Sequence, residues 1–217
     1  MSRETLSFLA AARGLSLVTP GDAGIGVAST EVPRLCRDQL AGRLVELSAQ
    51  GASATLTTAV GILHEVQQLG EPAAWIGPRS TSFFPPDLAA RGIDLDALIV
   101  VRTEPVAGSP PILRAAERLL RSGGFGLVIL DGGRTLELPM AAQGRLAGLS
   151  QQHDAIVLCL TEKPADAASL GSMVSLRIEA LRRRDGERWF ATMRALKDKR
   201  RGPGWHQDVA LRGRPLG

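Results

Sequence analysis

A short loop of mainly small residues at 49–56 stands where this sequence would be expected to bind phosphate groups. Before it, the apolar run 44–47 predicts a buried strand. After it, apolar residues recur at helical spacing, as at Val60 and Leu63, and a second apolar strand follows at 73–76. A strand, a loop, a helix and a further strand in this order form the frame in which nucleotide-binding α/β domains hold phosphates.

The residues that phosphate chemistry needs are absent from this loop. A phosphate-binding loop has the pattern G-x-x-x-x-G-K-[ST]: its glycines let backbone N–H groups wrap the phosphates, its lysine neutralises their charge, and its hydroxyl binds Mg²⁺. In this chain the corresponding positions are Ala49, Ala54, Thr55 and Leu56. The sequence therefore predicts a nucleotide-binding frame whose loop is degenerate and holds no nucleotide cofactor.

The region 43–77 and five later segments resemble RecA, the recombinase ATPase, in order and spacing. The later segments are FFPPDLAARGIDLDALIVVRTEP (83–105), LLRSGGFGLVILDGG (119–133), AIVLCLTEKP (155–164), SLRIEALRRRDGERW (175–189) and ALKDKRRGPG (195–204). The resemblance implies an α/β fold with a RecA-like core. Such a core has a mainly parallel central sheet flanked by helices, and here an antiparallel hairpin at its C-terminal end.

One core domain with a short N-terminal extension is the expected organisation. Residues 1–30 contain a short amphipathic segment and a Gly/Ala-rich stretch, and we expect them to form an N-terminal arm. Residues 31–217 are expected to form the RecA-like core with a short basic C-terminal tail. The sequence has neither a long apolar run nor a signal-peptide pattern, so we expect a cytoplasmic protein that does not enter a membrane.

The resemblance also identifies the positions that would carry ATP hydrolysis. RecA-type ATPases activate the attacking water with a Glu after the second core strand. Arg79 stands nearest to that position, and a cation cannot activate water. Asp131 matches the Walker B carboxylate that would organise Mg²⁺, although a carboxylate there could instead cap the turn 131–133. Together these positions predict no catalytic residue and no ATP hydrolysis.

No group of residues has the spacing of a metal site. The three histidines are scattered, and the two cysteines, Cys36 and Cys159, are far apart and predicted to be free thiols. We therefore expect no metal.

Positive charge is concentrated in the C-terminal part of the chain. The region 177–217 contains 12 basic and 5 acidic residues, whereas the rest of the chain has three more acidic than basic residues. Five arginines in two runs are candidates for DNA binding: Arg182, Arg183, Arg184, Arg200 and Arg201. The alternative is a solvated hairpin, because no aromatic residue is interleaved within these runs. DNA binding is accordingly expected to be weak and independent of base sequence.

A second interface is implied by the resemblance. In RecA filaments two lysines of a K-x-K strand face the nucleotide held by the neighbouring protomer. Lys197 and Lys199 stand at the matching positions and are candidates for a partner or filament interface. The alternative is that alternating lysines protect an edge strand from pairing with other chains.

A RecA-like core with a degenerate loop and small size is similar to the ImuA group of SOS mutagenesis proteins. That similarity implies an adaptor without enzymatic activity in the DNA damage response. Its partners in translesion synthesis would be ImuB-like and error-prone polymerase subunits, and RecA. Two alternatives stay open: a RecA-family ATPase with an unorthodox phosphate loop, and a SulA-like cell division inhibitor that binds a tubulin-like GTPase.

Overall fold

The computed structural model describes residues 35–80, 83–104 and 111–211. The expected N-terminal arm, residues 1–30, lies outside this part of the chain. In chain order the described elements are α2 (Arg37–Leu40), β1 (Arg43–Ala49), α3 (Thr55–Gln68), β2 (Ala73–Pro78), α4 (Pro85–Ala89), β3 (Leu98–Thr103), α5 (Pro111–Arg121), β4 (Leu127–Gly133), α6 (Met140–Gln152), β5 (Ile156–Glu162), β6 (Leu176–Asp185), β7 (Arg188–Asp198) and β8 (His206–Leu211).

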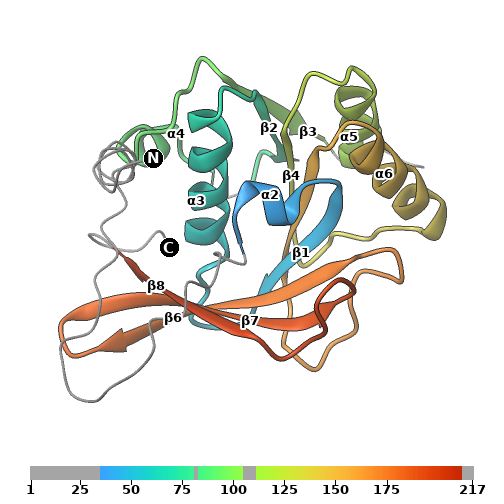
Figure 1. The fold of residues 1–217 in the computed structure, drawn as a ribbon. Coiled ribbons are helices and arrows are strands. Elements are labelled where there is room, and N and C mark those ends of the chain that lie inside the picture. Colours follow the sequence, from blue (N-terminus) through green and yellow to red (C-terminus); the bar gives the residue numbers. More distant parts are fainter. Residues whose placement is uncertain (1–34, 81–82, 105–110, 212–217) are drawn as a thin grey trace, which may run out of the picture. The chain divides into compact units, whose positions relative to one another are not determined.

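The described strands form one sheet in the order β3-β2-β4-β5-β1-β6-β7-β8 (Figure 1). The pairs from β3 to β6 are all parallel, with β1 lying between β5 and β6. All seven residues of β1 are buried, which is typical of a parallel strand covered on both faces. The expected α/β fold with a mainly parallel sheet is confirmed.

The last strands are antiparallel. β6 and β7 form the expected hairpin, and its two-residue turn begins with Gly186 at a φ of 58°. A positive φ at this position suits glycine and closes a tight hairpin. The structure adds β8, which the sequence did not predict, on the outer side of β7. β7 therefore lies between two strands from Trp189 to Arg194, whereas Lys197 lies beyond the residues that pair with β8.

Helices cover both faces of the parallel region. In Figure 1, α3 lies on one side of this region, and α5 and α6 lie on the other. Val60 and Leu63 of α3 pack into one buried apolar cluster, and Leu120 and Leu146 of α5 and α6 pack into a second. Within the described residues, no helix is long and apolar enough to cross a bilayer.

A buried ion pair joins β1 to the end of β7. Arg43 Nη2 lies 2.7 Å from Asp198 Oδ1, and Trp205 Nε1 donates to Asp198 Oδ2 at 3.0 Å. Burial alone would raise the pKa of Asp198. The hydrogen bonds from Arg43, the Arg200 N–H and Trp205 outweigh burial and hold that pKa below its ordinary value.

Candidate functional site

The degenerate loop between β1 and α3 is hydrogen-bonded to β6. The Ala54 N–H donates to the Ala180 carbonyl at 2.9 Å, and the Arg182 N–H donates to the Ala52 carbonyl at 2.7 Å. Between these bonds, Ser53 pairs with Leu181 in an isolated antiparallel bridge. A phosphate-binding loop needs its N–H groups free for the ligand, whereas here the Ala54 N–H is already bonded within the protein.

The start of α3 is also occupied. Ser53 Oγ accepts a bond from the Thr55 N–H at 3.2 Å and lies 2.8 Å from Thr55 Oγ1. Ala54 is only 1% exposed, so its methyl group belongs to the core at the position where glycine would leave room for phosphate. The hydroxyls of Thr57 and Thr58 are buried without a partner in the first turn, but neither can replace a lysine charge. These residues do not fit a nucleotide.

Asp131, at the C-terminal end of β4, has a structural partner that the sequence did not indicate. Trp75 of β2 donates from Nε1 to Asp131 Oδ2 at 3.1 Å, and both side chains are buried. The indole and the carboxylate come from neighbouring parallel strands, 56 positions apart in the chain. A buried indole N–H needs an acceptor, and Asp131 supplies it. This bond accounts for an acidic residue at position 131 without a role in binding Mg²⁺.

Arg79 follows β2, as expected, and is paired with a carboxylate. Its Nε lies 2.6 Å from Glu104 Oε1, and both side chains are largely exposed. Glu104 comes directly after β3, which pairs in parallel with β2 through Pro78 and Thr103. Glu104 could not be picked out from the sequence, because parallel pairing brings together strand ends 25 positions apart.

Residues 163–172, which we name the clamped loop, follow β5 and are held to β1 by Glu46. This carboxylate is fully buried. Oε1 accepts from Thr161 Oγ1 at 3.1 Å and lies 2.6 Å from Lys163 Nζ. Oε2 accepts from Ser169 Oγ at 3.0 Å and from the Leu170 N–H at 2.9 Å. Within the clamped loop, the charge of Lys163 is engaged by Glu46.

Two further cations bind carbonyl groups of the clamped loop. Arg177 of β6 is 3% exposed and donates to the carbonyls of Pro164, at 2.7 Å, and of Ala167. Lys197 of β7 donates to the carbonyl of Gly171 at 3.0 Å. Burial, and then the neighbouring charge of Lys199, lower the pKa of Lys197. Lys199 is exposed just beyond the end of β7. Of the two candidate interface lysines, Lys197 is therefore bonded within the fold, whereas Lys199 lies at the surface.

The arginine run at 182–184 lies near the tip of the β6–β7 hairpin. The strand register places Arg183 opposite Phe190 and Arg184 opposite Trp189. The guanidinium carbon lies 5.1 Å from the ring centroid in the first pair and 5.8 Å in the second. Arginines and aromatics are therefore interleaved across the strands, which the sequence read along the chain did not show.

Acidic residues offset part of this positive charge. Arg183 makes ion pairs with Asp185 at 3.5 Å and with Asp208 at 3.3 Å. Arg184 donates to the Gly186 carbonyl at 2.8 Å. Because Arg183 is paired twice, the run offers phosphates less charge than its sequence suggests.

The second arginine run, Arg200 and Arg201, is hydrogen-bonded to α2 and to the residue that follows it. Arg200 donates to the Ala41 carbonyl at 3.1 Å and to the Gln39 carbonyl at 3.4 Å, and Arg201 donates to the Gln39 side chain. The register of β6 with β7 puts the two runs at opposite ends of β6, about 20 Å apart along the strand. The structure does not bring them together into one phosphate-binding face.

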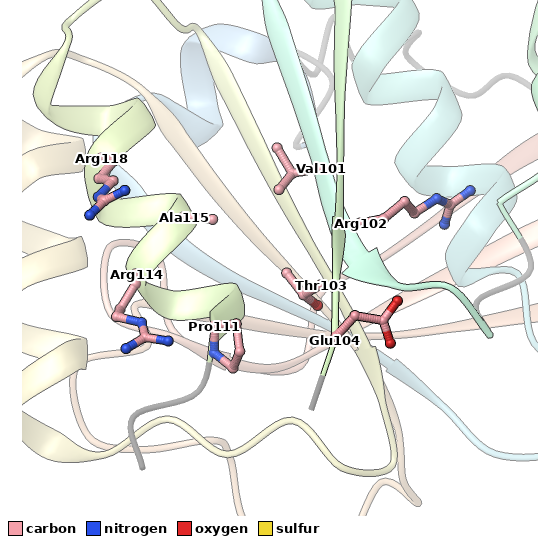
Figure 2. Close-up of a pocket in the computed structure, with 8 residues that line it drawn as sticks. All are labelled: Val101, Arg102, Thr103, Glu104, Pro111, Arg114, Ala115 and Arg118. Carbon is pink, nitrogen blue, oxygen red and sulfur yellow. The ribbon is translucent and has the colours of Figure 1, made fainter. Parts of the chain in front are cut away.

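A hollow of about 400 Å³ lies between β3 and α5, and we name it the β3–α5 hollow (Figure 2). Its lining residues are Val101, Arg102, Thr103, Glu104, Pro111, Arg114, Ala115 and Arg118. None of the residues predicted from sequence lines this hollow. Amphipathic spacing would place exposed arginines on α5, but the sequence carries no signal that a hollow lies beside them.

Both cysteines are free, and Cys159 is fully buried. Burial, and then the nearby Glu46, raise the pKa of the Cys159 thiol. Within residues 35–80, 83–104 and 111–211, no three His, Cys, Asp or Glu side chains gather as metal ligands.

Comparison with known proteins gives a partial match. No family model matches the chain. Over 90 residues the chain is 36% identical to the protein named RecA of Clostridium acetobutylicum. The matched part of the chain is RecA-like. The match covers 42% of this chain and only 25% of that RecA, so the relationship is established for part of the length alone.

Proposed function

We propose that this chain is a RecA-like adaptor without ATPase activity that acts in the bacterial DNA damage response. The observation that carries the proposal is the pairing of the degenerate loop with β6. The Ala54 N–H, which would face a phosphate in an active loop, instead donates to Ala180. The buried methyl group of Ala54 and the lack of a lysine at position 55 support the same conclusion.

The similarity to the ImuA group supports the choice of partners. On this basis the chain works in SOS mutagenesis and translesion synthesis with ImuB-like and error-prone polymerase subunits, and contacts RecA. Lys199 is the better candidate for a RecA filament contact, because Lys197 is hydrogen-bonded to the clamped loop. Direct DNA binding is a minor part of the proposal, since Arg183 is already paired with two aspartates.

Titration calorimetry with ATP and Mg²⁺ tests the loss of nucleotide binding. We expect no measurable heat of binding for the parent chain, with an active RecA as the positive control. The variant Ala54→Gly/Thr55→Lys/Leu56→Thr restores three of the four loop positions. It is expected to show no turnover, because Arg79 still stands at the position of the water-activating Glu. A dissociation constant in the low micromolar range for the parent would contradict the proposal.

Co-purification tests the adaptor role separately. A tagged chain is expected to retain an ImuB-like subunit from cells in which DNA damage has been induced, and to retain it without added ATP. Retention of a tubulin-like GTPase in place of polymerase subunits would favour the division-inhibitor alternative.

A further inference from the structure

Two exposed methionines lie where the clamped loop meets the start of α6. Met140 is the first residue of α6 and is 60% exposed, and Met173 directly follows the clamped loop and is 39% exposed. Ser172 Oγ lies 3.6 Å from Met140 Sδ, so the end of the loop touches the beginning of the helix. Exposed methionine side chains are apolar and adaptable, and they recur on surfaces that bind other proteins.

The backbone beneath these methionines is held in place. Gln143 of α6 is 3% exposed, donates to the Leu138 carbonyl at 2.6 Å and accepts from the Met173 N–H at 3.1 Å. Glu46 holds the preceding part of the clamped loop by accepting from Ser169 and from the Leu170 N–H. A surface whose backbone is already fixed loses little conformational entropy when a partner binds.

The same face of α6 leaves room for a partner. Gly144 lies one turn beyond Met140 and therefore on the same side of the helix. It is exposed, and a Cβ added at this position would meet no atom within 4 Å. A second helix can thus approach α6 closely beside Met140. We name the surface formed by Met140, Gly144, Ser172 and Met173 the methionine patch.

Positive charge borders the methionine patch. Lys197 Nζ donates to the Gly171 carbonyl at 3.0 Å and to the Ser172 carbonyl at 3.4 Å, so this cation lies against the loop side of the patch. Lys199 is exposed two residues further on, and its charge acts on Lys197. In the part of the chain that the structure describes, the Lys199 ammonium group makes no ion pair or hydrogen bond. The border of the patch is therefore complementary to a carboxylate.

We propose that the methionine patch binds an acidic amphipathic helix of a partner protein. The apolar face of that helix lies on Met140 and Met173, and its carboxylates lie toward Lys197 and Lys199. In this mode apolar side chains at helical spacing anchor the helix, and charges at the rim orient it. The inference rests on the proposed adaptor role, for which it names the contact surface and the chemistry of the partner.

The composition of the methionine patch favours a helix over other occupants. The patch is built from a helix and a loop, so an extended chain would find no open strand there to pair with. It contains no aromatic residue on which a nucleic-acid base could stack. A phosphodiester backbone would also leave both methionines in water. An acidic amphipathic helix covers the methionines and pairs with the cations.

Fluorescence anisotropy with a synthetic peptide tests the apolar contacts. The probe is a fluorescein-labelled helical peptide with leucine on one face and glutamate on the other. We expect Met140→Gln/Met173→Gln to weaken its binding about tenfold or more, because both anchors become polar. The matched control, Leu69→Gln/Leu95→Gln, changes two exposed apolar side chains outside the patch and should alter affinity by less than about twofold. Equal weakening in both variants, or a parent that does not bind the peptide, would overturn the proposal.

A bulky residue at Gly144 tests where the peptide docks. Gly144→Glu introduces a better helix former, so the urea midpoint of unfolding should not fall. The new side chain occupies the space beside Met140 and repels an acidic helix, so peptide binding should weaken about tenfold or more. Gly61→Glu is the matched control, because Gly61 is an exposed glycine of α3 where an added Cβ also meets no atom within 4 Å. Peptide binding that is unchanged in Gly144→Glu would overturn the proposal.

Reversing one charge tests the complementarity of the border. Lys199→Glu should weaken peptide binding about fivefold or more, whereas Arg188→Glu, which makes the same change at the exposed end of the β6–β7 hairpin, should weaken it by less than about twofold. Equal weakening in these two variants would show that binding reflects net charge alone, and would overturn the proposal.

Three further measurements separate other occupants and the adaptor role. Displacement of the peptide by a single-stranded oligonucleotide would assign the methionine patch to nucleic acid. A dimer in sedimentation that is lost in Gly144→Glu would assign it to a second copy. Either result would overturn the proposal, and neither is expected. Co-purification of a polymerase subunit with Gly144→Glu, at the level of the parent, would overturn the docking surface and leave the adaptor role standing.

Discussion

The clamped loop and the β3–α5 hollow both have cations beside strands of the same sheet, and they differ in what those cations contact. Lys163 and Arg177 lie against Glu46, which is fully buried. Arg114 and Arg118 have no carboxylate partner among the described residues. Buried charges are tolerated only when they are paired, whereas exposed unpaired cations remain available to a ligand. The comparison indicates that the charges at the clamped loop hold the fold and those at the hollow are free for binding.

Removing Glu46 should have the largest effect on stability. Glu46→Gln leaves Lys163 and the buried Arg177 without a counter-charge, and breaking a buried pair in this way costs about 3–5 kcal/mol. Urea denaturation measures the change in the free energy of unfolding. The control Glu104→Gln removes an exposed carboxylate that is paired with Arg79, and should cost no more than about 1 kcal/mol. Similar losses in the two variants would show that Glu46 is not a structural clamp.

Asp198→Asn should produce the next largest loss, about 1.5–3 kcal/mol at neutral pH, because a charge-assisted bond to buried Arg43 is weakened. The folded-state pKa of Asp198 is depressed, so its contribution is present above the unfolded-state pKa, about 3.9, and is lost as pH falls through the folded-state value. The gap in unfolding free energy between parent and variant should therefore shrink below about pH 4. A gap that stays constant down to pH 2 would contradict this assignment.

The two interface lysines should respond differently to substitution. Lys197→Ala removes bonds to carbonyls of the clamped loop and should lower the unfolding free energy by about 1–2 kcal/mol, whereas Lys199→Ala should change it by no more than about 0.5 kcal/mol. If Lys199 docks on RecA, this chain should cap one end of a RecA filament on single-stranded DNA and shorten it, and Lys199→Ala should reduce that shortening. Filament shortening unchanged in Lys199→Ala would place any docking face elsewhere.

The hairpin arginines should give the smallest effect, and it concerns binding. DNA affinity of the parent should be weak and steeply salt-dependent, with each phosphate contact adding about 0.7–0.9 to the log–log salt slope. Because Arg183 is paired with aspartates, we expect a salt slope that corresponds to only one or two phosphate contacts. Replacing Arg182, Arg183 and Arg184 by Glu should abolish this binding. Affinity unchanged in the triple variant would identify a solvated hairpin.

Much of the frame followed from sequence because its signals are local. The apolar run before residue 49 and the helical spacing of Val60 and Leu63 predicted β1 and α3. Residue type alone showed that positions 54 and 55 lack the glycine and the lysine of a phosphate-binding loop. The order of the later segments predicted the RecA-like sheet and the β6–β7 hairpin, but not β8.

Only the tertiary structure decided how these elements use their polar groups. The partners of Glu46 lie 115 or more positions away in the chain, and the degenerate loop pairs with β6, which begins more than 100 positions later. The strand register interleaves Arg183 and Arg184 with aromatic rings that the linear sequence sets apart. Sequence patterns specify which residues are buried and which are polar, whereas parallel crossovers and register specify which of them meet.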